Sequence, residues 1–343
     1  MKKYSVAILG ATGAVGQEFL KLIEERNFPF DKLKLLASGR SAGKTIDFMG
    51  KSYIVEEATP DSFNDVQIAL FAGGSISKTL APEAAKRGAI VIDNSSAFRM
   101  DPEVPLVVPE VNPEAIKNHK GIIANPNCST IIMVMALKPI YDAVKIKRIV
   151  VSTFQAVSGA GKEAIDELTE QVKASVENRP IEANILPSAS MPKHYQIAFN
   201  LLPHIDVFVE DDYTKEEMKM VHETHKILND YTIGITATTV RVPVYRSHSE
   251  SINIEMNDSL SPTEAKQLLA NFPGVIVQDD PTEMLYPMPL YTSDRNEVFV
   301  GRIRLDKTVP YGLNMWVVGD QIRKGAALNA VQIAEYMIEH NLI

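Results

Sequence analysis

The chain reads Gly10-Ala11-Thr12-Gly13-Ala14-Val15-Gly16 between an apolar run at residues 4–9 and a segment at about 14–26 with apolar residues at helical spacing. Glycines between a strand and a helix permit a tight turn and let a pyrophosphate approach backbone N–H groups at the helix N-terminus. The spacing is GxxGxxG rather than GxGxxG, and in this context it favours nucleotide binding over a plain tight turn.

Strand and helix patterns continue to alternate around this loop. Apolar runs predict further strands at residues 34–37, 67–71, 89–92 and 122–124, and helical spacing predicts a helix at 77–87. Strands that alternate with helices indicate a parallel, doubly wound sheet of the Rossmann type.

The pattern changes from residue 146. Longer runs rich in Val, Ile and Thr predict strands at 148–155, 233–242, 251–256, 298–304 and 315–318, with helices at 162–176 and 215–228. Partial alternation favours a mixed, mostly antiparallel sheet in an α+β domain. An amphipathic helix at 326–338 could return to the first domain, so we predict one domain at 1–127 plus 323–343 and a second at 128–322.

Composition excludes several classes of protein. The chain has 343 residues, a net charge of −8 and a single cysteine, and it contains no apolar run near the length of a membrane helix. An acidic chain repels nucleic acid and anionic lipid, so neither is an expected partner. One cysteine cannot form an intramolecular disulfide, and we expect a cytoplasmic protein.

The end of the second predicted strand favours NADP over NAD. NAD-binding proteins usually place an acid there to bind the ribose hydroxyls. This chain instead reads Ser38-Gly39-Arg40-Ser41-Ala42-Gly43-Lys44. An arginine flanked by hydroxyls suits a 2′-phosphate, because guanidinium and phosphate form charge-assisted hydrogen bonds. The alternative is that Arg40 and Lys44 are ordinary solvated charges.

Cys128 is a candidate nucleophile. It lies in Asn127-Cys128-Ser129-Thr130, where a predicted strand passes into a helix that we expect to end at about Leu137. A helix N-terminus lowers the pKa of a thiol because its dipole favours negative charge. A single cysteine is more often a small buried apolar residue, but beside a nicotinamide it suggests thioester chemistry on an aldehyde or acyl group.

The ordered set of motifs resembles bacterial aspartate-β-semialdehyde dehydrogenase over essentially the whole chain. The motifs are those quoted above together with Asp93-Asn94-Ser95-Ser96-Ala97-Phe98-Arg99, Gln155-Ala156-Val157-Ser158-Gly159-Ala160-Gly161, Val240-Arg241-Val242-Pro243, His248-Ser249-Glu250-Ser251 and Lys324-Gly325-Ala326-Ala327. The resemblance implies reduction of aspartyl 4-phosphate by NADPH to aspartate semialdehyde and phosphate, on the route to lysine, threonine, methionine and isoleucine. It also implies a homodimer or a dimer of dimers.

The resemblance assigns roles to individual residues. Cys128 would form the thioester, His248 would be the acid/base, Gln155 would orient the substrate, and Asn127 would position groups around the intermediate's oxygen. Four residues would bind the substrate: Arg99 and Lys219 its phosphate, Arg241 its α-carboxylate and Glu216 its ammonium group. Without the family, Glu216 and Lys219 would be interpreted as a surface ion pair.

The cofactor would contact both parts of the chain. The positions implied are Gly10, Thr12, Gly13, Ala14, Val15, Gly16, Ser38, Arg40 and Ser41, with Ser158, Gly159 and Gln321 near the nicotinamide. The other histidines match no catalytic motif, and His222 and His225 lack the HExxH spacing, so no metal site is predicted.

Two alternatives remain. A related acyl-phosphate or acyl-CoA reductase, acting on N-acetylglutamyl phosphate or malonyl-CoA, would share the cysteine-thioester plan. The pairing of Arg241 with Glu216 favours a free amino acid, since an acylated amine needs no acidic partner. The second alternative is a nucleotide-sensing or structural dimer without enzymatic activity.

Overall fold

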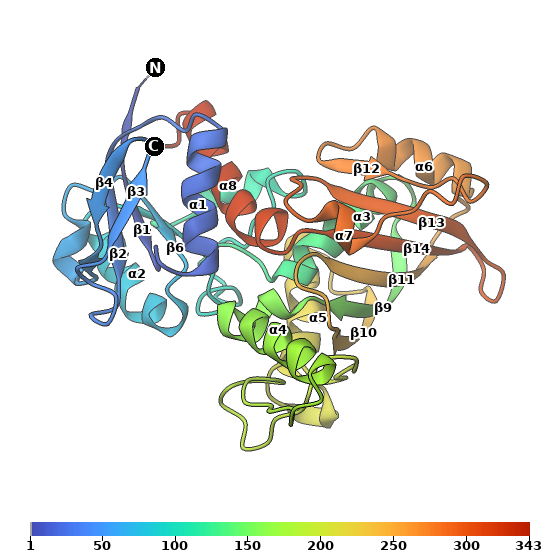
Figure 1. The fold of residues 1–343 in the computed structure, drawn as a ribbon. Coiled ribbons are helices and arrows are strands. Elements are labelled where there is room, and N and C mark those ends of the chain that lie inside the picture. Colours follow the sequence, from blue (N-terminus) through green and yellow to red (C-terminus); the bar gives the residue numbers. More distant parts are fainter. Residues whose placement is uncertain (1) are drawn as a thin grey trace. The chain divides into compact units, whose positions relative to one another are not determined.

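The computed structural model describes residues 2–343, which divide into two units. Unit 1 comprises the chain up to Asn127 with Lys226–Leu228 and Gly325–Ile343, and unit 2 comprises Cys128–His225 and Asn229–Lys324 (Figure 1). The C-terminal segment therefore belongs to the same unit as the glycine loop.

Unit 1 is built on a parallel sheet with strand order β5-β2-β1-β6-β7-β8. Its strands are β1 (Tyr4–Leu9), β2 (Phe30–Ala37), β5 (Glu56–Glu57), β6 (Ile68–Phe71), β7 (Ile90–Asp93) and β8 (Ile122–Ala124), and β3 (Thr45–Phe48) and β4 (Lys51–Ile54) form a separate hairpin. Its helices are α1 (Ala14–Glu25), α2 (Ser77–Lys86) and α8 (Leu328–Glu339). The predicted doubly wound sheet is confirmed.

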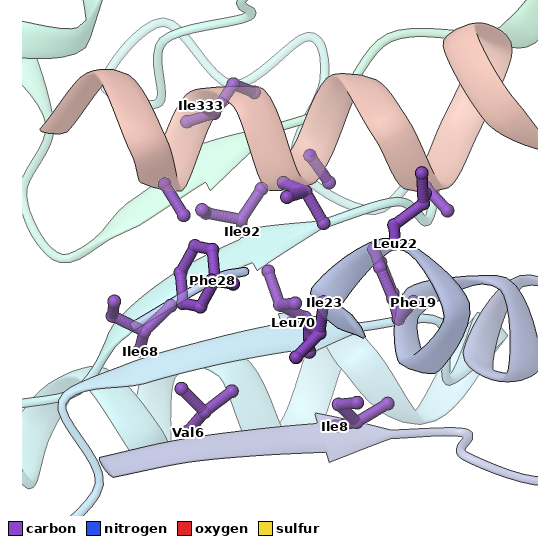
Figure 2. Close-up of a cluster of buried hydrophobic side chains, with 14 of the residues drawn as sticks. Val6, Ile8, Phe19, Leu22, Ile23, Phe28, Ile68, Leu70, Ile92 and Ile333 are labelled. Carbon is purple, nitrogen blue, oxygen red and sulfur yellow. The ribbon is translucent and has the colours of Figure 1, made fainter. Parts of the chain in front are cut away.

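Both faces of this sheet are buried, which explains why its strands read as continuous apolar runs. On one face, α1 and α8 pack against alternate residues of the central strands. Figure 2 shows side chains of this cluster, among them Ile333 of α8, Phe19 and Ile23 of α1, and Leu70 of β6. On the other face, Leu80 and Ala84 of α2 pack against the intervening residues.

Unit 2 is built on a mixed sheet with strand order β10-β9-β11-β14-β13-β12. Its strands are β9 (Ile146–Gln155), β10 (Gly234–Arg241), β11 (His248–Met256), β12 (Val275–Val277), β13 (Val298–Asp306) and β14 (Gly312–Gly319). Its helices are α3 (Cys128–Val144), α4 (Lys162–Val176), α5 (Lys215–Leu228), α6 (Pro262–Ala270) and α7 (Pro289–Thr292). The three central strand pairs are antiparallel and the two outer pairs are parallel, as a mixed, mostly antiparallel sheet requires.

Three boundaries differ from the sequence prediction in ways that matter for the site. The helix after Cys128 does not end near Leu137 but continues through Pro139 to Val144, because burial of its surface outweighs the hydrogen bond that proline removes. β11 begins at His248 rather than at residue 251, so the histidine is part of the sheet. The last helix begins at Leu328, after a π-helical turn at Arg323–Ala327.

No helix within residues 2–343 has the length and apolarity that crossing a bilayer requires.

Gly10 and Gly16 make the glycine loop compact. Gly10 has a φ of 83°, and a Cβ on Gly16 would lie 2.2 Å from the Gly10 carbonyl oxygen, whereas one on Gly13 would lie 3.4 Å from it.

We expect Gly16→Ala to lower the free energy of unfolding by about 1–3 kcal/mol through this overlap. Gly13→Ala, the matched control, should change it by less than about 1 kcal/mol. Urea denaturation measures both, and equal effects would contradict the steric argument.

Candidate active site

Three of the predicted site residues lie together at one end of neighbouring strands in the unit 2 sheet. β9 and β10 run parallel and end in register at Gln155 and Arg241. β11 runs antiparallel to β9, so its first residue, His248, lies at the same edge as the last residues of the other two strands. The register thus brings together residues that are far apart in the sequence.

His248 is held by the backbone of the loop after β9. The Ala156 N–H donates to His248 Nδ1 over 3.1 Å, and Nε2 lies 3.3 Å from Gln155 Nε2. Because Nδ1 accepts a hydrogen, a neutral His248 carries its own hydrogen on Nε2. The pKa of His248 is lowered to about 3, mainly by burial and also by the charge of Arg241, while the charge of Glu216 opposes both effects.

Gly159 leaves room for this arrangement. A Cβ at this position would lie 2.9 Å from Arg241 Nη1 and 3.3 Å from His248 Nε2. The predicted residue Gly159 therefore lies against two other predicted residues in unit 2, and a side chain there would displace one of them.

α5 contributes an ion pair to the same edge. Gln155 Nε2 donates to Glu216 Oε1 over 3.2 Å, and Lys219 Nζ donates to Glu216 Oε2 over 2.9 Å and to Asp206 Oδ2 over 2.8 Å. Burial lowers the pKa of Lys219, but the two carboxylates outweigh it and raise the value to about 12. Glu216 is buried, so this pair is not an ordinary surface ion pair.

Arg241 is a buried cation with remaining capacity to donate. Its Nη1 donates to the Ala156 carbonyl over 2.7 Å, and its Nε meets no hydrogen-bond acceptor in the described part of the chain. Burial lowers the pKa of Arg241, while the negative charges of Glu216 and Cys128 oppose that effect. Cys128, the first residue of α3, is half-buried and within electrostatic reach of this guanidinium.

Gln321 links Ser158 to the residue before His248. Its Nε2 donates to Ser158 Oγ, and its Oε1 accepts the Ser247 N–H over 2.8 Å. Ser247 is fully buried and has a φ of 72°, a conformation that a serine adopts only when its surroundings impose it. The Gln321 amide therefore joins the turn after β9 to the residue before β11.

The remaining predicted residues belong to unit 1. Arg99 is buried, and its guanidinium donates to the carbonyl oxygens of Asn125 over 2.9 Å and Asn94 over 2.8 Å. Asn127, also buried, ends the first stretch of unit 1. The glycine loop precedes α1, whose N-cap residue, Gly13, offers no side chain to the N–H groups of the first turn.

The loop after β2 contains the predicted Ser38, Arg40 and Ser41. Ser38 and Arg40 are exposed, and the Ser41 N–H donates to the Ser38 carbonyl over 2.8 Å. The sequence prediction found no acid at the end of this strand. The structure places the Glu57 carboxylate 2.9 Å from the position of a Cβ on Gly39, because β5 pairs with the end of β2.

Comparisons with known proteins show which family the chain resembles. Residues 5–119 match the family model "Semialdehyde dehydrogenase, NAD binding domain", and residues 137–324 match "Semialdehyde dehydrogenase, dimerisation domain". The chain is 60% identical to the aspartate-semialdehyde dehydrogenase of Aquifex aeolicus, over 99% of each chain, and 55% identical to that of Bacillus subtilis, over 98% of each.

The chain belongs to the aspartate-semialdehyde dehydrogenase family. It is therefore an enzyme, as the sequence predicted. A solved structure of aspartate semialdehyde dehydrogenase II from Vibrio cholerae, complexed with ASA, is 47% identical with a TM-score of 0.93, and the match covers 99% of both chains. The Candida albicans enzyme with NADP is 26% identical with a TM-score of 0.77, and the match covers both chains completely.

Sequence reasoning missed several residues of this site. Asp206 binds Lys219 from the loop before α5, and Thr153 Oγ1 donates to Gln155 Oε1 over 3.0 Å. Glu250 is fully buried two residues after His248. The alternation of His248 and Glu250 along one strand could have indicated that both face the interior, whereas nothing in the sequence signalled Asp206.

The low pKa of His248 makes stability depend on pH. The unfolded chain binds a proton at this histidine as the pH falls through its ordinary pKa of 6.5, whereas the folded chain does not until about 3. The stabilisation is therefore present above pH 6.5 and is lost as the pH falls towards 3.

We expect wild type to lose unfolding free energy relative to His248→Asn by about 1.4 kcal/mol per pH unit below pH 6. The asparagine carbonyl can still accept the Ala156 N–H, so the comparison isolates the titration. Urea denaturation at pH 7, 6 and 5 measures the difference, and parallel curves would contradict a neutral His248.

Proposed function

We propose that the chain reduces L-aspartyl 4-phosphate to L-aspartate 4-semialdehyde and phosphate with NADPH, through a thioester on Cys128. The observation that carries the proposal is the placement of Cys128 at the N-terminus of a helix, within electrostatic reach of Arg241, in the unit that also holds Gln155 and His248. The same reaction would supply the lysine, threonine, methionine and isoleucine pathways.

Cys128 acts first, as the nucleophile. The α3 N-terminus and the Arg241 guanidinium favour its thiolate, which attacks the acyl carbon of the substrate. A carbon–sulfur bond forms, the carbon–oxygen bond to the phosphoryl group breaks, and phosphate leaves with the bonding electrons. Asn127, which precedes the nucleophile, is assigned to the oxygen of this tetrahedral intermediate.

The thioester is then reduced and released. NADPH, when bound, supplies a hydride to the thioester carbon. The negative charge that develops on the substrate oxygen is stabilised by a donor, and we assign this role to His248 because its hydrogen lies on Nε2. Collapse of the thiohemiacetal breaks the carbon–sulfur bond, which releases the aldehyde and restores the Cys128 thiolate.

Charged residues recognise the substrate. We assign Arg241 to the α-carboxylate, because the Nε of its buried guanidinium meets no acceptor among residues 2–343. Glu216 would bind the ammonium group, and Gln155, hydrogen-bonded to Glu216, would orient the substrate beside the thiol. Arg99 and Lys219 would bind the phosphate, with Lys219 kept cationic by its two carboxylate partners.

Glu216 argues against the related reductases. A buried carboxylate beside Arg241 suits a free amino acid with one charge of each sign. An acetylated amine or an acyl-CoA carries no ammonium group for Glu216 to bind beside Lys219.

The glycine loop fits NADP. The uncapped first turn of α1 offers N–H groups to a pyrophosphate, and the close approach of Gly16 to Gly10 leaves no side chain in the way. Thr12, Ala14 and Val15 complete this loop, and Arg40 with Ser38 and Ser41 would bind the 2′-phosphate. Ser158, Gly159 and Gln321 are assigned to the nicotinamide end.

The larger organisation is also a proposal. Unit 1 would be the NADP-binding domain and unit 2 the catalytic and dimerisation domain of a cytoplasmic homodimer, or of a dimer of dimers. The match of residues 137–324 to a dimerisation domain supports the dimer.

The reverse reaction tests the chemistry. We expect wild type to reduce NADP with aspartate semialdehyde only when inorganic phosphate is present, and Cys128→Ser to be inactive while NADP binding is retained. Absorbance of the reduced nicotinamide measures turnover, and calorimetry with NADP is the control. Phosphate-independent turnover would contradict an acyl phosphate as the substrate, and an active Cys128→Ser would contradict the thioester.

The cofactor preference has its own test. Arg40→Ala should raise the KM for NADPH about tenfold or more, through loss of a charge-assisted bond, and leave the KM for NADH nearly unchanged. Steady-state kinetics with each cofactor measures the ratio. Lys44→Ala, four residues along the same loop, is the matched control for a general loss of positive charge. Equal changes for both cofactors would remove Arg40 from the 2′-phosphate site.

A further inference from the structure

Asp320 is a buried carboxylate to which the proposed reaction gives no role. It directly follows β14, and its side chain is 0% exposed. Arg246 Nε donates to its Oδ2 over 2.6 Å, and the Asp294 N–H donates to the same oxygen over 2.7 Å. Its Oδ1 accepts the N–H groups of Ile322 over 2.9 Å and Arg323 over 3.0 Å. Each oxygen of this carboxylate therefore joins it to different segments of unit 2.

The Oδ2 atom of Asp320 holds the segment that precedes His248. The sheet register pairs His248, the first residue of β11, with Gly319, the last residue of β14. Arg246 lies two residues before His248, and Asp320 lies one residue after Gly319. The bond between Arg246 and Asp320 therefore extends the attachment of these two strands beyond their last paired residues.

Ser247, the residue between Arg246 and His248, needs this support. Its φ of 72° costs roughly 1–3 kcal/mol for a residue with a side chain, so it persists only where neighbouring groups impose it. Gln321 Oε1 accepts the Ser247 N–H over 2.8 Å, and Thr292 Oγ1 donates to Ser247 Oγ over 3.0 Å. The bond to Arg246 fixes the preceding residue. Relaxation of Ser247 would turn the peptide that leads into His248 and would move the imidazole.

The Oδ1 atom of Asp320 holds the turn that contains Gln321. Its two N–H donors, on residues 322 and 323, follow Gln321 in the chain. The Gln321 Nε2 donates to Ser158 Oγ, and both residues are assigned above to the nicotinamide end of the cofactor. One carboxylate thus supports the approach to His248 through Oδ2 and the residues assigned to the cofactor through Oδ1.

We propose that Asp320 is a positioning residue with two separable effects: Oδ2 places His248 for turnover through Arg246, and Oδ1 places Gln321 for NADP binding. This inference rests on the roles proposed above for His248 and Gln321. An ion pair that served only the stability of the fold would change the melting temperature of its variants and leave their kcat unaltered.

Two substitutions at Asp320 separate the effects. Asp320→Asn keeps an oxygen for the turn and places an NH2 group, which cannot accept, against Arg246 and the Asp294 N–H. We expect it to lower kcat about tenfold or more and to change the Kd for NADP less than about twofold. Asp320→Ala loses both attachments and should also weaken NADP binding about tenfold. Steady-state kinetics and calorimetry with NADP measure the two quantities.

Arg246→Leu breaks the same bond from the other side. It leaves Asp320 with an uncompensated buried charge, whereas the double variant Asp320→Asn/Arg246→Leu removes both charges and should be more stable than Arg246→Leu. We expect kcat of the double variant to be no lower than that of the slower single variant, because both substitutions remove one interaction. Losses of kcat that multiply in the double variant would contradict action through the Arg246 bond.

Two matched controls address stability and charge. Asp294→Asn removes the outer carboxylate of Arg246, which lies 2.8 Å from Nη1 on a side chain that is 64% exposed, and it should keep wild-type kcat. Asparagine tolerates the φ of 63° at this position. Leu313→Ala, buried near the other end of β14, should lower the melting temperature without the loss of kcat.

His248→Asn distinguishes failure of this inference from failure of the proposed function. A wild-type rate in His248→Asn would remove the role of His248 itself. If His248→Asn is inactive while Asp320→Asn keeps wild-type kcat, only the positioning role of Asp320 is overturned. Equal effects of Asp320→Asn and Asp320→Ala on both kcat and the Kd for NADP would also overturn it, because the two oxygens would then not serve separate segments.

Discussion

The register of β9 against its two neighbours is the constraint on which the site depends. Gln155 and Arg241 meet because two parallel strands end together, and His248 joins them because the third strand runs the other way and begins there. A slip of one residue between β9 and β11 would turn His248 and Glu250 to the opposite face of the sheet. The long antiparallel core of unit 2 therefore specifies the geometry of the chemistry as well as the stability of the fold.

The charged side chains of the site can be buried in unit 2 because they lie near opposite charges. Lys219 binds Glu216 and Asp206, and Arg241 lies within the field of Glu216 and Cys128. Leaving one of these charges unpaired would cost several kcal/mol, so removal of one member exposes the others to that cost. Two other buried groups respond differently: burial lowers the pKa of His248 and raises that of Glu250, so in each it favours the neutral form. Two buried groups in which the neutral form is favoured, His248 and Glu250, therefore lie in the same unit as the paired charges of Lys219, Glu216 and Asp206.

Sequence patterns were enough to predict the strands and helices whose bounds depend on neighbouring residues in the chain. β1, the turn at Gly10 and α1 were predictable from an apolar run, glycines and helical spacing, and α4 has the predicted bounds. The end of α3 was not, because Pro139 signals a stop that only tertiary burial overrides. Asp206, Thr153 and Glu57 escaped prediction for another reason: their partners Lys219, Gln155 and Gly39 are identified by contacts across the fold, and no residue pattern in the chain encodes those contacts.

The hydrogen bond from the Ala156 amide to His248 bears on the roles proposed for Cys128 and His248. Since Nδ1 accepts that N–H, the hydrogen of a neutral His248 lies on Nε2, where it can donate but cannot accept a thiol proton without becoming cationic beside Arg241. The thiolate must then be favoured by other groups, and the α3 N-terminus with Arg241 provides them. In the proposed reaction His248 stabilises charge on the substrate oxygen, a role that a residue with a pKa of about 3 can fill near neutral pH. The bonds of Gln155 to Thr153 and Glu216 turn its amide oxygen away from His248, which leaves the Nε2 hydrogen available for the proposed role.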